Sequence, residues 1–180
     1  MKKIVAICGL AGGGKSECRK FFEKKGFVYV HFGVTEMVLE KYGDTNEKLE
    51  RPLRKKLRDE RGMAVMAEIA LPKIKKIHNE NKNVVIDNLY SWAEYKLFKE
   101  KYKTNFYVIS VHTTPSIRYR RLKKRAFRGL EKKEAISRDY SHIEELDVGG
   151  PIAMADFHVL NDGDIKALHA QLSDIYVTLK

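Results

Sequence analysis

Short apolar runs alternate with amphipathic stretches along this chain of 180 residues. Runs rich in valine, isoleucine and aromatic residues predict β-strands, over residues 3–8, 26–32, 83–88, 105–112 and 156–161. Apolar positions three or four residues apart predict helices, over residues 17–25, 36–42, 53–77, 91–101, 115–129, 132–146 and 165–179. The alternation predicts an α/β fold, a three-layer α/β/α sandwich around a parallel sheet of about five strands.

Prolines and glycines set the expected element boundaries. The polar segment 44–52 is predicted to be a turn, and Pro72 is predicted to end or kink the helix over 53–77. Thr114-Pro115 predicts a helix start, with a capping threonine before a proline at the first helical position. Gly149-Gly150-Pro151 predicts a break after the helix over 132–146.

Residues 9–16, Gly-Leu-Ala-Gly-Gly-Gly-Lys-Ser, complete the pattern G-x-x-x-x-G-K-[ST] between the first predicted strand and helix. This context indicates a phosphate-binding P-loop, because glycines let successive backbone N–H groups face one concavity at a helix N-terminus. We expect Lys15 to contact the β- and γ-phosphates and the Ser16 hydroxyl to bind Mg²⁺. The nucleotide-binding residues expected here are Gly9, Ala11, Gly12, Gly13, Gly14, Lys15, Ser16 and Glu17. The alternative is a glycine-rich turn with a chance lysine.

Asp87 ends the apolar run 83–88. The carboxyl end of a buried strand lies beside the P-loop, where an acid would hold a Mg²⁺-bound water or orient an attacking hydroxyl. Asp87 is therefore a candidate catalytic and metal-binding residue. The alternative is a turn residue that caps the end of the strand.

Arginines recur along the predicted helix that follows Thr114. Arg118, Arg121, Arg125 and Arg128 fall within about one quarter of its circumference. Guanidinium groups stabilise the charge of a phosphoryl group in transfer. We expect Arg121 and Arg125 to be catalytic and Arg118 and Arg128 to bind substrate; the alternative is a solvated basic helix.

Two further candidates are less specific. Arg58, in the predicted helix over 53–77, would contact a phosphate-bearing acceptor, and the alternative is an exposed arginine paired with acids one turn away. Asn161, after the last predicted strand, would face an adenine ring, and the alternative is an ordinary tight turn in Asn161-Asp162-Gly163.

Composition indicates one soluble globular domain, with 43% hydrophobic and 33% charged residues. The net charge of +11 suits anionic partners, namely nucleotides, phosphorylated metabolites or nucleic acid. No apolar run approaches the ~20 residues of a membrane span, and the first strand leaves no room for a signal peptide. Cys8 and Cys18 lack metal-ligand spacing, so we expect reduced packing residues in a cytoplasmic protein.

The P-loop, the strand ending at Asp87, the strand 108–112 with its arginine helix, and residues 155–163 together resemble the P-loop small-molecule kinases. The layout is similar to nucleoside monophosphate kinases and dephospho-CoA kinase, and most similar to a largely archaeal family of nucleotide-kinase-like proteins. The resemblance implies ATP and Mg²⁺ as cofactors. It also implies a single domain over 1–180, with an acceptor-binding region at about 33–80 and a lid at about 118–145.

The chain departs from these families at three places. They usually carry an aspartate after the second strand, whereas residues 31–36 read His-Phe-Gly-Val-Thr-Glu, in which Glu36 would have to substitute as an acceptor-binding acid. The acid of the third strand is commonly followed by Gly-x-Arg, and here it is followed by Asn88-Leu89-Tyr90. The predicted lid lacks the four cysteines of the zinc site in some adenylate kinases.

These features predict ATP- and Mg²⁺-dependent phosphoryl transfer to a nucleotide or a nucleotide-like small molecule. The alternatives are a nucleotide-binding NTPase or switch that acts on nucleic acid or a protein partner, and a degenerate kinase that only binds ATP. Nucleic acid is not favoured, because the basic surface carries no interleaved aromatic residues for single strands. The chain also has no N-K-x-D element for guanine.

Overall fold

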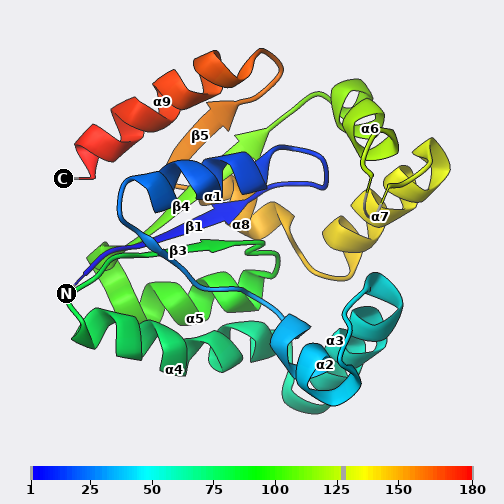
Figure 1. Cartoon of the computed structure of the whole chain (residues 1–180), viewed down its shortest axis with the longest axis horizontal. Helices are drawn as coiled ribbons and strands as arrows, with labels where there is room; N and C mark the ends of the chain where they lie inside the picture. The colour runs from blue at the N-terminus through cyan, green and yellow to red at the C-terminus, as the bar shows by residue number, and fades with distance from the viewer. Residues whose placement is uncertain (1, 127–128, 180) are drawn as a thin grey trace.

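The computed structural model describes residues 2–126 and 129–179, apart from the side chain of Glu47. Its centre is a five-stranded sheet in which every pairing is parallel (Figure 1). The strands lie in the order β2 (Val28–Tyr29), β3 (Val84–Asp87), β1 (Ile4–Cys8), β4 (Phe106–His112) and β5 (Phe157–Leu160). The predicted α/β fold with a parallel sheet is therefore confirmed.

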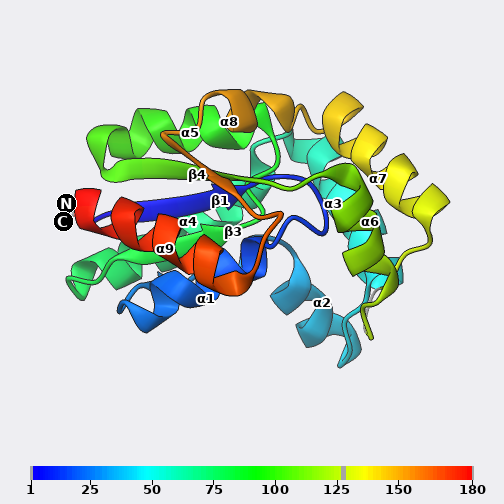
Figure 2. The same cartoon turned by 90° about the horizontal axis from the view of Figure 1, so that it is seen from above.

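Helices cover both faces of this sheet (Figure 2). One face packs against α1 (Lys15–Lys24) and α9 (Ile165–Thr178), and the other against α4 (Val65–Asn79), α5 (Trp92–Tyr102) and α8 (Gly149–Ala153). Along β1, Val5 and Ile7 join the first core, whereas Ile4 and Ala6 join the second. A strand buried on both faces must be apolar throughout, which explains the continuous hydrophobic run in the sequence.

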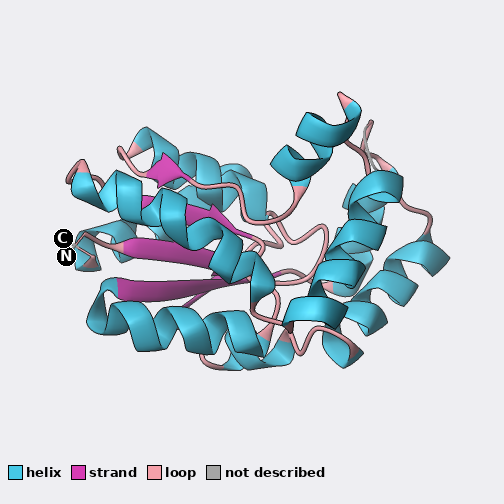
Figure 3. Ribbon diagram, turned by 90° about the horizontal axis from the view of Figure 1, so that it is seen from below, coloured by secondary structure: helices cyan, strands magenta, loops and turns pink. Residues whose placement is uncertain are grey.

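The remaining helices lie beyond the carboxyl ends of the strands (Figures 1 and 3). They are α2 (Thr35–Tyr42), α3 (Glu47–Arg61), α6 (Pro115–Lys123) and α7 (Lys132–Glu144), while the short 3₁₀ turn η1 (Lys103–Asn105) precedes β4. Because all five strands are parallel, their carboxyl ends and the loop after β1 share this edge of the molecule.

The boundary predictions fail in the region between β2 and β3. Segment 44–52 is not a turn, because α3 begins at Glu47 under the cap of Asn46, whose side chain accepts a hydrogen bond from the Leu49 N–H at 3.2 Å. Gly62, at φ +88°, then ends α3 and splits the helix predicted over 53–77. Pro72 does not end α4, whose apolar face is buried on the sheet and offsets one lost backbone hydrogen bond.

Two later predictions also fail. The helix predicted over 115–129 ends at Lys123, so Arg125 lies outside α6 and Arg128 lies outside the described residues. The arginines therefore do not share one helical face. Gly149-Gly150-Pro151 is not a break but the start of α8, because Pro151 falls in the first turn, where no backbone donor is needed.

Cys8 and Cys18 are free and buried, as expected for packing residues. The described residues form no helix with the length and hydropathy that a membrane crossing requires.

Candidate phosphate-binding site

The P-loop follows β1 and enters α1 at Lys15. Gly12 and Gly14 have φ values of +78° and +104°, and both are confined by neighbouring atoms. A Cβ on Gly12 would lie 2.7 Å from the Arg118 carbonyl oxygen, and one on Gly14 would lie 2.1 Å from Asn161 Nδ2. Both positions therefore require glycine, for conformation and for space.

Lys15 is 8% exposed and is bound to its own loop. Its Nζ donates hydrogen bonds to the carbonyl oxygens of Gly9 (2.9 Å) and Leu10 (3.1 Å). The ring centroid of Tyr90 lies 5.3 Å from the same nitrogen. We expect a nucleotide to replace these carbonyls with phosphate oxygens.

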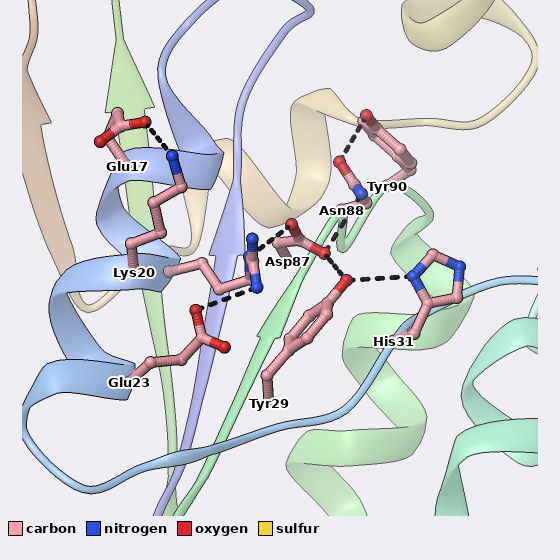
Figure 4. Close-up of polar contacts among 9 residues, drawn as sticks. Glu17, Lys20, Glu23, Tyr29, His31, Asp87, Asn88 and Tyr90 are labelled. Atoms are coloured by element: carbon pink, nitrogen blue, oxygen red, sulfur yellow. Dashed lines mark hydrogen bonds and ion pairs between the residues drawn. The ribbon is translucent and has the colours of Figure 1, made fainter.

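Asp87 is buried at the end of β3 and is the centre of a polar network (Figure 4). Its Oδ1 accepts hydrogen bonds from the Tyr29 hydroxyl (3.0 Å) and from Asn88 Nδ2 (3.3 Å). Its Oδ2 lies 3.5 Å from Nε of Arg19, whose guanidinium also lies over the Tyr29 ring. Burial and the charge of Asp87 raise the pKa of Tyr29. Sequence reasoning missed Tyr29 and Arg19, although strand alternation places Tyr29 on the same face of the sheet as Asp87.

The expected magnesium ligands are chemically suitable. Ser16 is exposed in the first turn of α1, and Asp87 supplies a carboxylate at the same edge. The described residues contain no cluster of three acidic, histidine or cysteine side chains. Mg²⁺ does not need such a cluster, because it keeps several waters and takes substrate phosphates with one or two protein oxygens. Ser16 and Asp87 are thus the residues that would hold it.

Arg118 does not have the environment expected of a substrate-binding residue. It is 3% exposed and forms a two-pronged ion pair with Asp139 of α7, at 3.0 and 2.8 Å. Its remaining donors reach the carbonyl oxygens of Ala11 (3.1 Å) and Thr113 (3.2 Å). Because its donors are used internally, we assign Arg118 to holding α6, α7 and the P-loop together.

Asn161 is also placed differently from the prediction. It is buried, and its Nδ2 donates to the Gly13 carbonyl oxygen at 2.7 Å. Its side chain therefore supports the P-loop from within the protein, and the contact expected with an adenine ring stays a prediction.

Cationic groups converge around Tyr90. Arg58 of α3 has an Nε that is buried without a hydrogen-bond partner in the described structure, and desolvation lowers its pKa. Desolvation and Arg138 lower the pKa of Arg125, which Tyr90 partly opposes. Tyr90 thus influences the charge of both Arg58 and Arg125, whereas the sequence placed the two arginines in separate groups.

His142 of α7 lies beside Tyr90 as a neutral ring and was missed by sequence reasoning. Its ring lies 4.6 Å from that of Tyr90, centroid to centroid. Burial lowers the pKa of His142 to about 3, with further lowering by Arg138, Lys15, Arg58 and Arg54. These cations belong to α7, the P-loop and α3. No local pattern distinguishes this histidine from an ordinary helical one.

The remaining predicted site residues are Arg121, Glu36 and Glu17. Arg121 has a buried Nη1 without a partner among the described residues. Hydrogen bonds from Thr114 lower the pKa of Asp162, and the charge of Arg121 lowers it further. Glu36 is exposed at the start of α2 and forms an ion pair with Lys73 of α4. Glu17, in the first turn of α1, pairs with Lys20 at 2.8 Å.

Comparison with known proteins places the chain in a family. A family model described as "AAA domain" matches residues 5–142. A UPF0200 protein of Thermococcus kodakarensis is 30% identical over 177 residues, covering 96% of this chain and 95% of the relative. A UPF0200 protein of Sulfurisphaera tokodaii matches with the same identity and coverage.

Solved structures with low sequence identity share the fold. A shikimate kinase from Bacteroides thetaiotaomicron superposes with a TM-score of 0.61 at 17% identity, covering 98% of each chain. A dephospho-CoA kinase from Campylobacter jejuni gives 0.54 at 16% identity, covering 99% of this chain and 98% of that one. The resemblance to P-loop kinases is thereby confirmed. The chain belongs to the AAA domain family that the matching model describes and to the UPF0200 proteins, with a P-loop kinase-like fold.

Proposed function

We propose that this protein transfers the γ-phosphate of ATP, with Mg²⁺, to a small acceptor that is a nucleotide or resembles one. In this proposal Lys15 and the loop amides bind the triphosphate, and Ser16 and Asp87 hold Mg²⁺. The metal supplies charge neutralisation on the phosphate oxygens. Arg121 and Arg125 stabilise the transferring group from the side of α6.

The observation that carries the proposal is the cationic cluster around Tyr90 beside the P-loop. In the described part of the chain the buried Nε of Arg58 has no partner, and neither has Nδ1 of His142, whose ring is neutral because burial lowers its pKa to about 3. Buried polar groups are rarely left unpaired, so such a concentration in one place favours an anionic ligand. An acceptor that carries its own phosphate would pair with Arg58 while its hydroxyl or phosphate oxygen faces the γ-phosphate.

The two helical segments beyond the sheet suit the acceptor and lid roles. We assign residues 33–80 to acceptor binding, because Arg58 enters the site from α3, and residues 118–145 to the lid, because Arg125 and His142 enter from the other side. The whole chain then acts as one kinase-like domain. We place the reaction in the cytoplasm, because both cysteines are unpaired thiols.

The test is ATP consumption with Mg²⁺ in the presence of single acceptors. We expect turnover with one or more phosphate-bearing acceptors, drawn from nucleoside monophosphates, deoxynucleoside monophosphates and dephospho-CoA. Shikimate and gluconate, which carry no phosphate, serve as comparison acceptors and should leave ATP consumption at background. ATP loss that needs no acceptor, or only a polynucleotide, would instead indicate an NTPase.

The Lys15→Ala variant is the control for nucleotide placement. An ATP analogue with Mg²⁺ should raise the melting temperature of the wild-type chain, because a ligand that binds only the folded state stabilises it. In Lys15→Ala this rise should disappear. If it persists, ATP binds elsewhere and the proposed site is wrong.

A further inference from the structure

A continuous hydrogen-bonded chain runs from β3 to the segment after β2 (Figure 4). The Tyr29 hydroxyl donates to Asp87 Oδ1 at 3.0 Å. The same hydroxyl oxygen lies 3.0 Å from Nδ1 of His31. Figure 4 shows the three side chains in line, with Tyr29 between the carboxylate and the imidazole.

The direction of the first hydrogen bond determines the second. A phenol has one proton, and here Tyr29 gives it to Asp87. The Tyr29 oxygen can therefore only accept from His31, so Nδ1 of His31 carries a proton. In a neutral imidazole the other nitrogen, Nε2, is then unprotonated and basic.

His31 lies at the edge of the sheet where the P-loop would hold the phosphate that is transferred. It follows β2 at the carboxyl edge of the sheet, where β3 ends at Asp87 and the P-loop begins. A Cβ on Gly33 would lie 3.3 Å from His31 Nε2, so glycine at this position keeps a side chain away from that nitrogen. A groove of about 270 Å³ borders His31 and Glu36 and continues along α4, where it is lined by Lys73, Lys76 and Ile77.

We propose that His31 is the general base for a hydroxyl acceptor, and that Tyr29 and Asp87 are positioning residues that hold its Nε2 unprotonated. The inference rests on the proposed phosphoryl transfer. The acceptor oxygen forms a bond to the γ-phosphorus while its proton passes to His31 Nε2. The bond from the γ-phosphorus to the β–γ bridging oxygen breaks, and ADP leaves with the electron pair. The imidazolium then releases its proton to water.

The kinetic test uses an acceptor that the wild-type protein phosphorylates. We expect His31→Gln to lower kcat by about 10²-fold, within the range of general-base catalysis, while the thermal shift with ATP analogue stays unchanged. Tyr29→Phe should lower kcat less and leave the acceptor KM unchanged, because this variant disturbs only the orientation of His31.

Added imidazole should restore part of the activity of His31→Ala, which a purely structural role would not allow. His78→Gln, in the last turn of α4, is the matched control and should keep wild-type kcat.

A second measurement does not depend on turnover. Nitrogen-15 chemical shifts of His31 at neutral pH should show a protonated Nδ1 and an unprotonated Nε2, and Tyr29→Phe should yield a mixture of tautomers. A proton on Nε2 in the wild-type protein overturns the base assignment whether or not an acceptor is known. If the wild-type protein transfers phosphate and His31→Gln keeps kcat within threefold, His31 is not the base and the proposed function still stands. If no acceptor is phosphorylated at all, the proposed function fails instead.

Discussion

Individual polar side chains hold the loop structure at the carboxyl edge of the sheet. Arg118 joins α6 to α7 through Asp139, and Asn161 joins the end of β5 to the P-loop at Gly13. Both residues are buried, so their hydrogen bonds form away from water, where an unmatched partner costs most. Each was expected to bind a ligand, and in the structure the side chain of each is hydrogen-bonded to the P-loop.

Arg118→Ala should destabilise the protein by about 3–5 kcal/mol, because it leaves the Asp139 carboxylate buried without its charge partner. The free energy of unfolding from urea denaturation measures this loss. Lys55→Ala, which removes an exposed ion pair on α3, is the control and should leave the denaturation midpoint unchanged. A stable Arg118→Ala protein that has lost only phosphoryl transfer would restore the substrate-binding role.

Asn161→Ala should weaken the binding of ATP and GTP equally, by about 5-fold, because one buried hydrogen bond to the P-loop contributes about 1 kcal/mol. A contact with the adenine ring would instead weaken ATP binding alone. Calorimetric titration with both nucleotides separates the two cases. Asn79→Ala, at the exposed end of α4, should leave both affinities as they are.

Among the helices beyond the sheet, α2 and α3 are joined by a buried polar group. Glu50 of α3 is 4% exposed and accepts hydrogen bonds from Thr35 at the start of α2 (2.9 Å) and from Arg54 (2.7 Å). Few apolar contacts of α2 reinforce this polar connection, since Val38 is the buried residue of that helix. Elements held by polar contacts and little apolar area open more easily than the sheet, which suits an acceptor-binding region.

Glu50→Ala should therefore increase amide hydrogen exchange in α2 and α3 while exchange in the sheet strands stays slow. The reason is that the variant removes the acceptor shared by both helices without changing the main core. Mass-spectrometric hydrogen exchange measures the difference by segment. Glu60→Ala, on the exposed side of α3, should show the wild-type pattern, and uniform acceleration over all segments would contradict the local role of Glu50.

At the scale of the whole molecule, burial shifts the pKa values of two groups, Glu94 and His142, in opposite directions. Burial raises the pKa of Glu94, at the start of α5, to about 7, while burial and nearby cations lower that of His142 to about 3. Between about pH 4.5 and 6.5 folded Glu94 holds a proton that the unfolded chain has lost. Over the same interval folded His142 lacks a proton that the unfolded chain has gained. Their contributions to the pH dependence of stability have opposite signs.

The wild-type free energy of unfolding should accordingly change little between pH 4.5 and 6.5. Glu94→Gln removes the contribution of Glu94 and keeps that of His142. The free energy of unfolding should then fall as the pH falls, by up to about 1.4 kcal/mol per pH unit. His142→Phe keeps only the contribution of Glu94, so the free energy of unfolding should rise as the pH falls. Urea denaturation across this interval measures the three slopes, and parallel slopes in all three proteins would refute the assignment.

Local patterns predicted the sheet and the P-loop well because their causes are local. A strand buried on both faces must be apolar at every position, as β1 and β3 are, and the loop needs glycines at fixed spacing. The helix limits between β2 and β3 were predicted poorly. Pro52 and Pro72 both lie inside helices, and only packing of those helices against neighbouring elements explains why they are tolerated.

The sequence by itself determined the fold class, the glycine-rich loop after β1 and an acid at the end of β3, since each depends on residues close together in the chain. The tertiary structure decided what the scattered polar residues do. It buried Arg118 and Asn161 as supports, brought Arg58 and Arg125 to Tyr90, and joined His31 to Asp87 through Tyr29. These roles depend on contacts between residues up to 148 positions apart, as from Asn161 to Gly13, and no pattern along the chain encodes such distances.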